Sequence, residues 1–162
     1  MNAEPEPTRI LPAYECWALL RATPVGRLAL CQDGQPEIFP VNFAVDHGTI
    51  VYRTSEGTKS HATEKAPVAF EVDGFYPDSS ADGGADGSTV EGRSIVWSVV
   101  VKGNAATIAV TSELMDTVQL SLHPWESGRK DRFMRLVPGT ISGRAFTLRS
   151  PDAPTNPEMS AP

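Results

Sequence analysis

The chain has 162 residues and a formal net charge of −6, with 14 Lys and Arg against 20 Asp and Glu. An acidic chain without a Lys/Arg cluster lacks the basic surface that nucleic-acid binding requires. No apolar run is long enough to span a membrane, and residues 1–12 lack the apolar core of a signal peptide. We therefore expect a cytoplasmic protein with one hydrophobic core and with neither nucleic acid nor membrane as partner.

The two ends of the chain differ in composition from its middle. Residues 1–10 form a Pro/Glu-rich arm and residues 150–162 a Pro-rich tail, both expected to be disordered. One domain is predicted between them, over residues 11–149. Within it, segment 77–93 is rich in Gly and Asp and is predicted to be a mobile loop, because it has almost no apolar residue. Its aspartates miss the ligand spacing of a calcium loop, so no calcium site is expected there.

Alternating apolar and polar residues predict a mainly β (α+β) fold. Strands are expected over residues 25–31, 37–45, 50–52, 68–72, 94–110 with a kink at 102–104, 132–137 and 141–148, and helices over 13–22, 60–65 and 111–122. Tight turns are expected at Asp33-Gly34, Asp46-His47-Gly48 and Pro138-Gly139. About seven antiparallel strands with two or three short peripheral helices indicate a small closed or split β-barrel.

The segment Arg53–Lys59 stands out because it combines cations, hydroxyl groups and a glycine. It follows the strand Ile50–Tyr52 and contains Arg53, Thr54, Thr58 and Lys59. Backbone N–H groups, hydroxyl donors and positive side chains are what a phosphate group requires. We expect the chain to leave the sheet here and to anchor a phosphate beside a flat cofactor.

Other chemistries find less support. No Gly-x-Ser-x-Gly motif is present, and His47, His61 and His123 have no evident acid partner, which argues against a hydrolase triad. The histidines also lack the spacing of a metal site, so no metal is predicted. Residues 57–60 read Gly-Thr-Lys-Ser, which is the wrong order for a nucleotide P-loop. Cys16 and Cys31 are expected to be free thiols.

Several short motifs together resemble one known family. They are Val25–Ala29, Pro40–Phe43, Tyr52–Thr54 with Gly57–Lys59, Trp97–Val99 and Gly103–Ala105. In this order, over residues 11–148, they resemble the pyridoxamine 5'-phosphate oxidase-like proteins, which are flavin-binding split β-barrels often found as small actinobacterial proteins. The resemblance implies a homodimer with one flavin mononucleotide (FMN) in each of two clefts at the subunit interface. Some relatives bind the deazaflavin F420 instead.

The resemblance also implies roles for particular residues. Val41 and Asn42 would run along the isoalloxazine edge, and Ser98 would lie near the flavin. Arg53, Thr54, Thr58 and Lys59 would hold the phosphate, in agreement with the composition of that segment. Trp97 and Trp125 would wall the pocket. Two alternatives stay open: Arg53 and Lys59 as surface charges, and the two tryptophans as core residues.

The C-terminal strand departs from the family's namesakes. Arg144–Leu148 lacks the Arg-x-His pairing that true pyridoxamine-phosphate oxidases use on their substrate, so oxidation of vitamin B6 is not expected. We expect an FMN-dependent oxidoreductase acting on a small-molecule substrate or electron donor, with no catalytic residue identified. The alternatives are an F420-dependent reductase and a non-catalytic carrier or sensor of flavin or haem.

Overall fold

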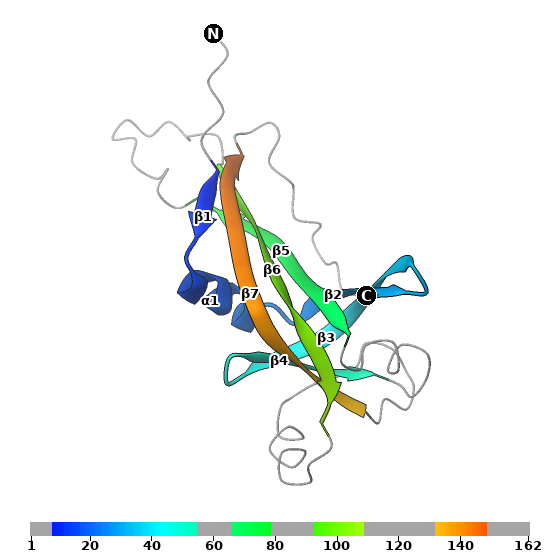
Figure 1. Cartoon of the computed structure of the whole chain (residues 1–162). Helices are drawn as coiled ribbons and strands as arrows, with labels where there is room; N and C mark the ends of the chain where they lie inside the picture. Colours follow the sequence, from blue (N-terminus) through cyan, green and yellow to red (C-terminus); the bar gives the residue numbers. More distant parts are fainter. Residues whose placement is uncertain (1–7, 55–65, 79–92, 109–131, 149–162) are drawn as a thin grey trace, which may run out of the picture.

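The computed structural model describes residues 8–54, 66–78, 93–108 and 132–148. In this part of the chain it contains one helix and seven strands (Figure 1). They are β1 (Arg9–Leu11), α1 (Ala13–Ala22), β2 (Val25–Gln32), β3 (Gln35–Asp46), β4 (Thr49–Thr54), β5 (Pro67–Pro77), β6 (Ser94–Thr107) and β7 (Arg132–Leu148). The helices predicted over 60–65 and 111–122 lie outside the described residues.

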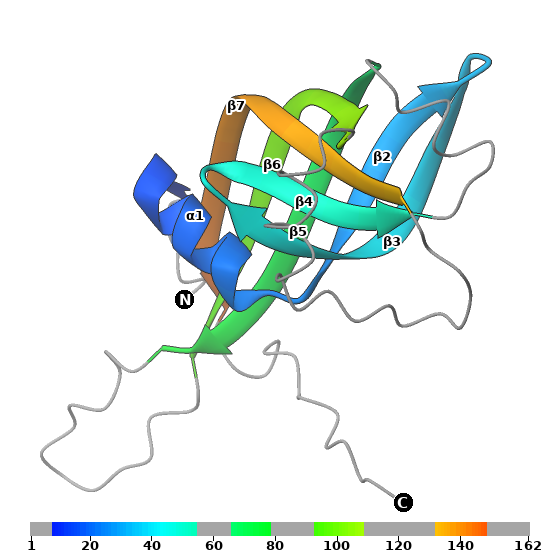
Figure 2. The ribbon, with the colours of Figure 1, turned by 90° about the horizontal axis from the view of Figure 1, so that it is seen from below.

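Six of the strands close into an antiparallel barrel. The sheet order is β1-β7-β4-β3-β2-β5-β6, and β6 also pairs with β7, which joins the two ends. Figure 2 shows these strands curving round the barrel, with α1 beside them. The mainly β barrel expected from the alternating sequence pattern is therefore confirmed.

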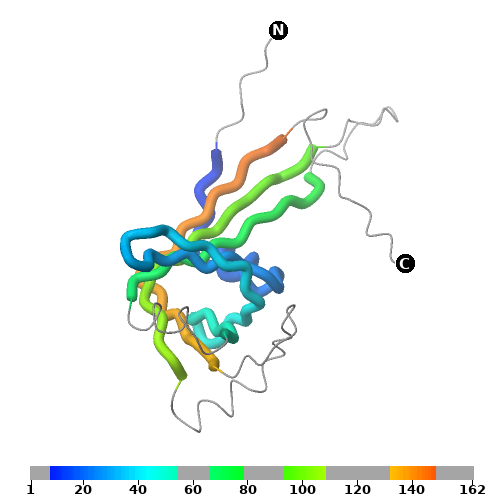
Figure 3. Tube along the Cα trace, turned by 90° about the vertical axis from the view of Figure 1, so that its right-hand side faces the viewer, coloured from blue at the N-terminus to red at the C-terminus, as the bar shows by residue number. Residues whose placement is uncertain are grey.

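Three long strands continue beyond the barrel. β2 pairs with β5 only over Arg27–Ala29, whereas β5 and β6 pair along the whole of β5. β6 pairs with β7 along the whole of β6, and β1 adds to the outer edge of β7. The ends of β5, β6 and β7, together with β1, therefore project from the barrel as a smaller sheet (Figure 3). We call this sheet the extension, and its strand ends comprise Arg9–Leu11, Val72–Pro77, Ser94–Val99 and Gly143–Leu148.

Two of the predicted turns are confirmed by their backbone angles. Asp33 and Gly34 have φ values of 50° and 78°, and His47 and Gly48 have φ values of 45° and 74°. Two successive residues with positive φ fit the two-residue hairpin turn that matches the twist of antiparallel strands. These turns fix the register of β2 on β3 and of β3 on β4.

The third predicted turn, at Pro138-Gly139, is wrong. β7 is one continuous strand, and Lys102 pairs with Thr140 while Gly103 pairs with Pro138. Gly139 is therefore an extra residue on β7, a β-bulge opposite the Lys102/Gly103 register shift. A Cβ at Gly103 would collide with the carbonyl oxygen of Val137, so the close approach of the two backbones requires glycine there.

Three predicted boundaries also differ from the structure. Arg9 and Ile10, assigned to the disordered arm, pair with β7 as part of β1. β5 continues to Pro77, beyond the strand expected over residues 68–72, because its second half pairs with β6. Arg53 and Thr54 remain within β4, because they pair with β7 instead of leaving the sheet.

The core fills the barrel and continues beneath α1. Pro12 precedes the helix as predicted, and its carbonyl oxygen accepts hydrogen bonds from the amides of Glu15 and Cys16. Cys16 and Leu20 are each 1% exposed and pack into the barrel core. Burial raises the pKa of the Cys16 thiol. Cys16 and Cys31 are both free, as expected.

Candidate functional site

The end of β4 and the beginning of β7 bring together positive and hydroxyl side chains. Arg53 pairs with Phe133 across the two strands, and Thr54 pairs with Arg132. The guanidinium carbon of Arg53 lies 5.1 Å from the centre of the Phe133 ring, which is within the range of a cation–π contact. Arg53 and Phe133 therefore share one face at this end of the barrel, and Thr54 and Arg132 share the opposite face, because successive strand residues alternate; we call this region the β4–β7 end.

A third arginine on β7 is occupied by a carboxylate. Arg135 donates hydrogen bonds through Nη1 to Oδ2 of Asp46, at 2.8 Å, and to Oγ1 of Thr49, at 2.7 Å. The hydrogen bond from Arg135 holds the pKa of Asp46 below its ordinary value, with a smaller contribution from His47 and with burial opposing. This ion pair ties the turn between β3 and β4 to β7, so we assign Arg135 a structural role.

Val41 and Asn42 lie next to each other on β3 but on opposite faces. Val41 packs against the barrel core, while Asn42 shares the outer face with Ala44, because successive strand residues alternate. Ala44 pairs with Val51, so that outer face is also the face of Arg53, two residues further along β4. Of the two residues expected along the isoalloxazine edge, Asn42 has its side chain on the face of Arg53.

Trp97 and Ser98 also point to opposite faces of one strand. Trp97 lies on the inner face of β6, is 8% exposed, and belongs to the core cluster. Ser98 lies on the outer face, where its neighbours across the strands are Asp73 of β5 and Arg144 of β7. The two side chains cannot therefore both contact the same side of one flat ligand from a single protomer.

The remaining residues expected to contact the flavin lie outside the described residues: they are Thr58, Lys59 and Trp125. Within the described ranges, no group of three or more His, Cys, Asp or Glu side chains could hold a metal ion. No helix in those ranges is long and apolar enough to cross a membrane.

His47 has an acid partner, contrary to the expectation that none was evident. Its Nδ1 lies 2.6 Å from Oδ1 of Asp46. The imidazole is almost fully exposed, at 95%, and Asp46 is already bound by Arg135. This pair therefore closes a surface turn and does not provide the enclosed setting of a catalytic dyad.

Arg132 and Phe133 are site residues that the sequence reasoning did not select. In the sequence both residues only begin the strand expected over residues 132–137. Their position became visible only through the pairing of β7 with β4. Arg132 alternates with the buried Met134 and Leu136, so its side chain belongs to the inward-facing row of β7, opposite the face of Arg53.

Comparisons with known proteins agree with this architecture. Residues 12–145 match the family described as pyridoxamine 5'-phosphate oxidase. The FAD binding protein from Mycobacterium smegmatis is 34% identical, with a TM-score of 0.65 and coverage of 85% of this chain and 99% of that one. A candidate pyridoxamine 5'-phosphate oxidase from Corynebacterium glutamicum is also 34% identical, with a TM-score of 0.69 and coverage of 88% and 100%.

A sequence relative extends the same relationship. The uncharacterized protein Rv0080 of Mycobacterium tuberculosis is 29% identical over 135 residues, covering 80% of this chain and 79% of its own length. The family match spans most of the domain, and the two solved structures share the strand arrangement. By sequence and by fold, the chain belongs to the pyridoxamine 5'-phosphate oxidase family.

Proposed function

We propose that this protein binds a flavin with its phosphate at the β4–β7 end and acts as a flavin-dependent oxidoreductase. The observation that carries the proposal is the position of Arg53, which pairs with Phe133 at the end of β4, with Thr54 and Arg132 on the opposite face of the same strand end. Guanidinium groups bind phosphate oxygens in a forked geometry, and a hydroxyl group adds a further donor. The 34% identical relative named for binding FAD supports a flavin as the cofactor class.

The residues at this end suit a phosphate in both charge and position. Arg53 is held against the Phe133 ring, which limits the directions its guanidinium group can take. Asn42 shares that face and offers an amide next to the same strand end. A bound flavin would supply the electron-transfer chemistry, while these side chains would bind and orient it.

FMN is the flavin that the sequence favours, and FAD is the second candidate. The segment around Arg53 offers donors for one phosphate, whereas the M. smegmatis relative is named for FAD. F420 is a third possibility, because the family resemblance includes users of that cofactor. Equilibrium titration of the purified protein with FMN, FAD and F420 separates them. Tightest binding of F420 would overturn the flavin proposal.

Replacing Arg53 tests the phosphate site directly. Arg53→Ala should weaken FMN binding by about 10- to 100-fold, because a hydrogen bond to a charged group contributes roughly 1.5–3 kcal/mol. Arg21→Ala is the matched control, since Arg21 is exposed in the last turn of α1 and should leave affinity unchanged. The double variant Arg53→Ala/Lys59→Ala should lose FMN altogether. Unchanged affinity in Arg53→Ala would exclude this site.

A second copy of the chain would complete the site. Arg53 pairs with Phe133 and Ser98 with Arg144, and these two partners lie eleven positions apart on β7. That is roughly 35 Å of strand at about 3.3 Å per residue. Arg53 and Ser98 would therefore reach one flavin only if Ser98 came from another protomer, which is our reason for proposing a homodimer.

The outer face of the extension provides a surface for that second copy. Phe75, Val96 and Phe146 lie side by side on neighbouring strands, and the two phenylalanines are 40% and 42% exposed. Exposed apolar patches of this kind mark interaction surfaces. Phe75→Lys/Phe146→Lys should elute as a monomer in gel filtration. Ile38→Lys, at a 64% exposed position on β3, should not change the mass, and a dimeric double variant would reject this interface.

The proposed oxidoreductase activity is tested on the flavin-loaded protein. NADH or NADPH should bleach the visible flavin bands, and pyridoxamine 5'-phosphate should not be oxidised. A loaded protein that no donor reduces would instead support a non-catalytic flavin carrier. A cytoplasmic location stays a prediction, which fractionation of the source cells would check.

A further inference from the structure

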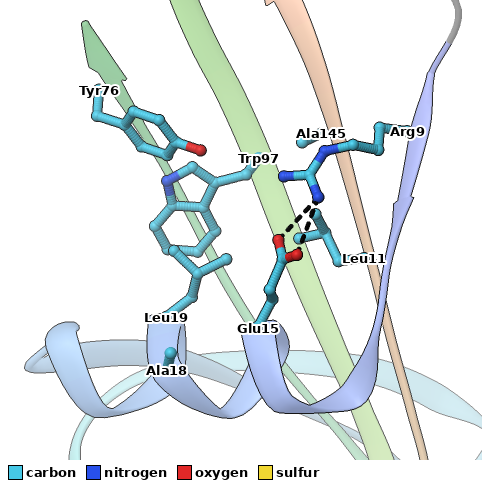
Figure 4. A pocket seen from close by; sticks show the side chains of 8 residues that line it. All are labelled: Arg9, Leu11, Glu15, Ala18, Leu19, Tyr76, Trp97 and Ala145. Carbon is cyan, nitrogen blue, oxygen red and sulfur yellow. Dashed lines mark hydrogen bonds and ion pairs between the residues drawn. The ribbon is translucent and has the colours of Figure 1, made fainter. Parts of the chain in front are cut away.

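A cavity lies on the inner face of the extension, between that sheet and α1. Its volume is about 140 Å³, and it is bounded by β1, α1, β5, β6 and β7 (Figure 4). The wall combines two aromatic rings, Tyr76 and Trp97, with an ion pair between Arg9 and Glu15. None of these four side chains has a role at the β4–β7 end.

The apolar part of the cavity exists because small residues surround Trp97. The indole lies against the backbone of Gly74, where a Cβ would come within 2.7 Å of the ring. Ala145, directly across β6–β7 from Trp97, and Ala18 on α1 are too short to fill the space beside it. Leu19 closes the cavity from the helix side (Figure 4). A small part of the indole, within the 8% of Trp97 that is exposed, is thereby left uncovered beside the cavity.

The polar part of the cavity is formed by Arg9, Glu15 and Tyr76. Arg9 donates through Nη1 to both carboxylate oxygens of Glu15, at 3.1 and 2.8 Å. This hydrogen bonding raises the pKa of Arg9, so the guanidinium group stays charged. The other amino group of Arg9 points toward Trp97, and the Tyr76 hydroxyl group turns to the same side (Figure 4). Tyr76 is 39% exposed and marks the mouth of the cavity.

These features define the ligand by size, charge and hydrogen bonding. An apolar cavity of about 150 Å³ accommodates one benzene ring. The Arg9–Glu15 pair carries no net charge, which favours a neutral ligand. Arg9 and Tyr76 interact with each other, and the polar hydrogens that they turn toward the cavity are donors. We propose that this cavity is a second ligand site, which takes a single neutral aromatic ring bearing an oxygen acceptor such as an amide or ketone carbonyl.

The site is separate from the proposed flavin contacts. Trp97 faces this cavity from β6, whereas the neighbouring Ser98 faces the opposite side of the sheet. Arg53 lies at the far end of β7, eleven positions from the residue that pairs with Ser98. Occupation of the cavity should therefore leave flavin binding unchanged.

Benzamide is a suitable probe, because it combines one neutral ring with a carbonyl oxygen. Titration into the full-length protein should shift the indole N–H resonance of Trp97 saturably, with Trp97→Phe identifying that signal. For a ligand of this size, a dissociation constant on the order of 0.1–1 mM is expected. Toluene lacks the acceptor, and cyclohexanecarboxamide lacks the aromatic ring. Each of these two compounds should bind at least several-fold more weakly than benzamide.

Matched variants decide whether binding occurs in this cavity. Ala18→Phe should fill the space and weaken benzamide binding at least 10-fold, and Ala18 is exposed, so the helix should tolerate the change. Ala22→Phe places the same ring at an exposed position on α1 away from the cavity and should bind like the wild type. Arg9→Met should weaken benzamide but not toluene.

Three results would overturn the proposal. The first is a wild-type protein without a saturable Trp97 shift, and the second is an Ala18→Phe variant that binds benzamide as tightly as the wild type. The third is displacement of benzamide by FMN, which would place both ligands in one site. Weakened FMN binding in Arg53→Ala with benzamide affinity retained is the expected result, and it keeps the two proposals separable.

Discussion

The two halves of β7 place their side chains in different surroundings. In the barrel half, β7 lies between β4 and β6, and the inward residues Met134 and Leu136 are fully buried. In the extension half, β7 lies between β1 and β6, its inward Ala145 borders a cavity, and its outward Phe146 is 42% exposed. The barrel half is completed by the chain itself, whereas both faces of the extension present surface suited to another molecule.

The largest expected effect tests that contrast through stability. Leu136→Ala should lower the free energy of unfolding by about 2–5 kcal/mol, because it leaves a cavity in a closed core. Phe146→Ala should cost less than about 0.5 kcal/mol in dilute solution, since the side chain is already partly exposed.

Urea unfolding at two protein concentrations distinguishes the two variants further. The decrease in unfolding free energy caused by Leu136→Ala should be the same at both concentrations, because that side chain packs within one protomer. The decrease in unfolding free energy caused by Phe146→Ala should grow with protein concentration, if its ring is covered only in a dimer. A Phe146→Ala variant that is as destabilised as Leu136→Ala in dilute solution would contradict the contrast between the two halves of β7.

A smaller effect is expected at the bulge that separates the two halves. Gly103→Ala should destabilise the protein by about 1–3 kcal/mol, because the new Cβ would meet the Val137 carbonyl oxygen. Gly139→Ala is the control within the same bulge: the nearest atom to its Cβ would be 3.6 Å away, an ordinary contact. Thermal unfolding of both variants checks the prediction, and equal melting temperatures would show that the backbones can separate freely.

Local signals in the sequence were enough to predict the hairpins. Asp33-Gly34 and His47-Gly48 form turns because their own backbone preferences favour positive φ. Pro138-Gly139 carries a similar signal, but its conformation is decided by Gly103 on another strand. The same reason explains Arg53, which stays in the sheet because β7 pairs with it. Contacts distant in sequence overruled the local preference in both cases.

The candidate sites were predictable to different degrees. The composition of Arg53 and Thr54 indicated a phosphate, but the contribution of Arg132 depends on long-range pairing. The alternation of strand residues already implies that Trp97 and Ser98 face opposite sides. The cavity beside Trp97 was not predictable, because Arg9 was assigned to a disordered arm and the small residues around the indole come from three separate segments.

The smallest effect concerns the ion pair that fastens β3 and β4 to the barrel half of β7. Arg135 lowers the pKa of Asp46 in the folded state, so the pair stabilises the protein above the unfolded carboxyl pKa of about 4. That contribution is lost as the pH falls through the lower folded-state pKa. Asp46→Asn should therefore lower the free energy of unfolding by about 1 kcal/mol at pH 7. The difference in unfolding free energy from the wild type should shrink as the pH is lowered below about 4. Asp33→Asn, at an exposed turn position that tolerates asparagine, should stay close to wild type throughout. Urea unfolding across this pH range measures the difference, and a cost for Asp46→Asn that does not change with pH would show that the carboxylate charge is not what holds the turn to β7.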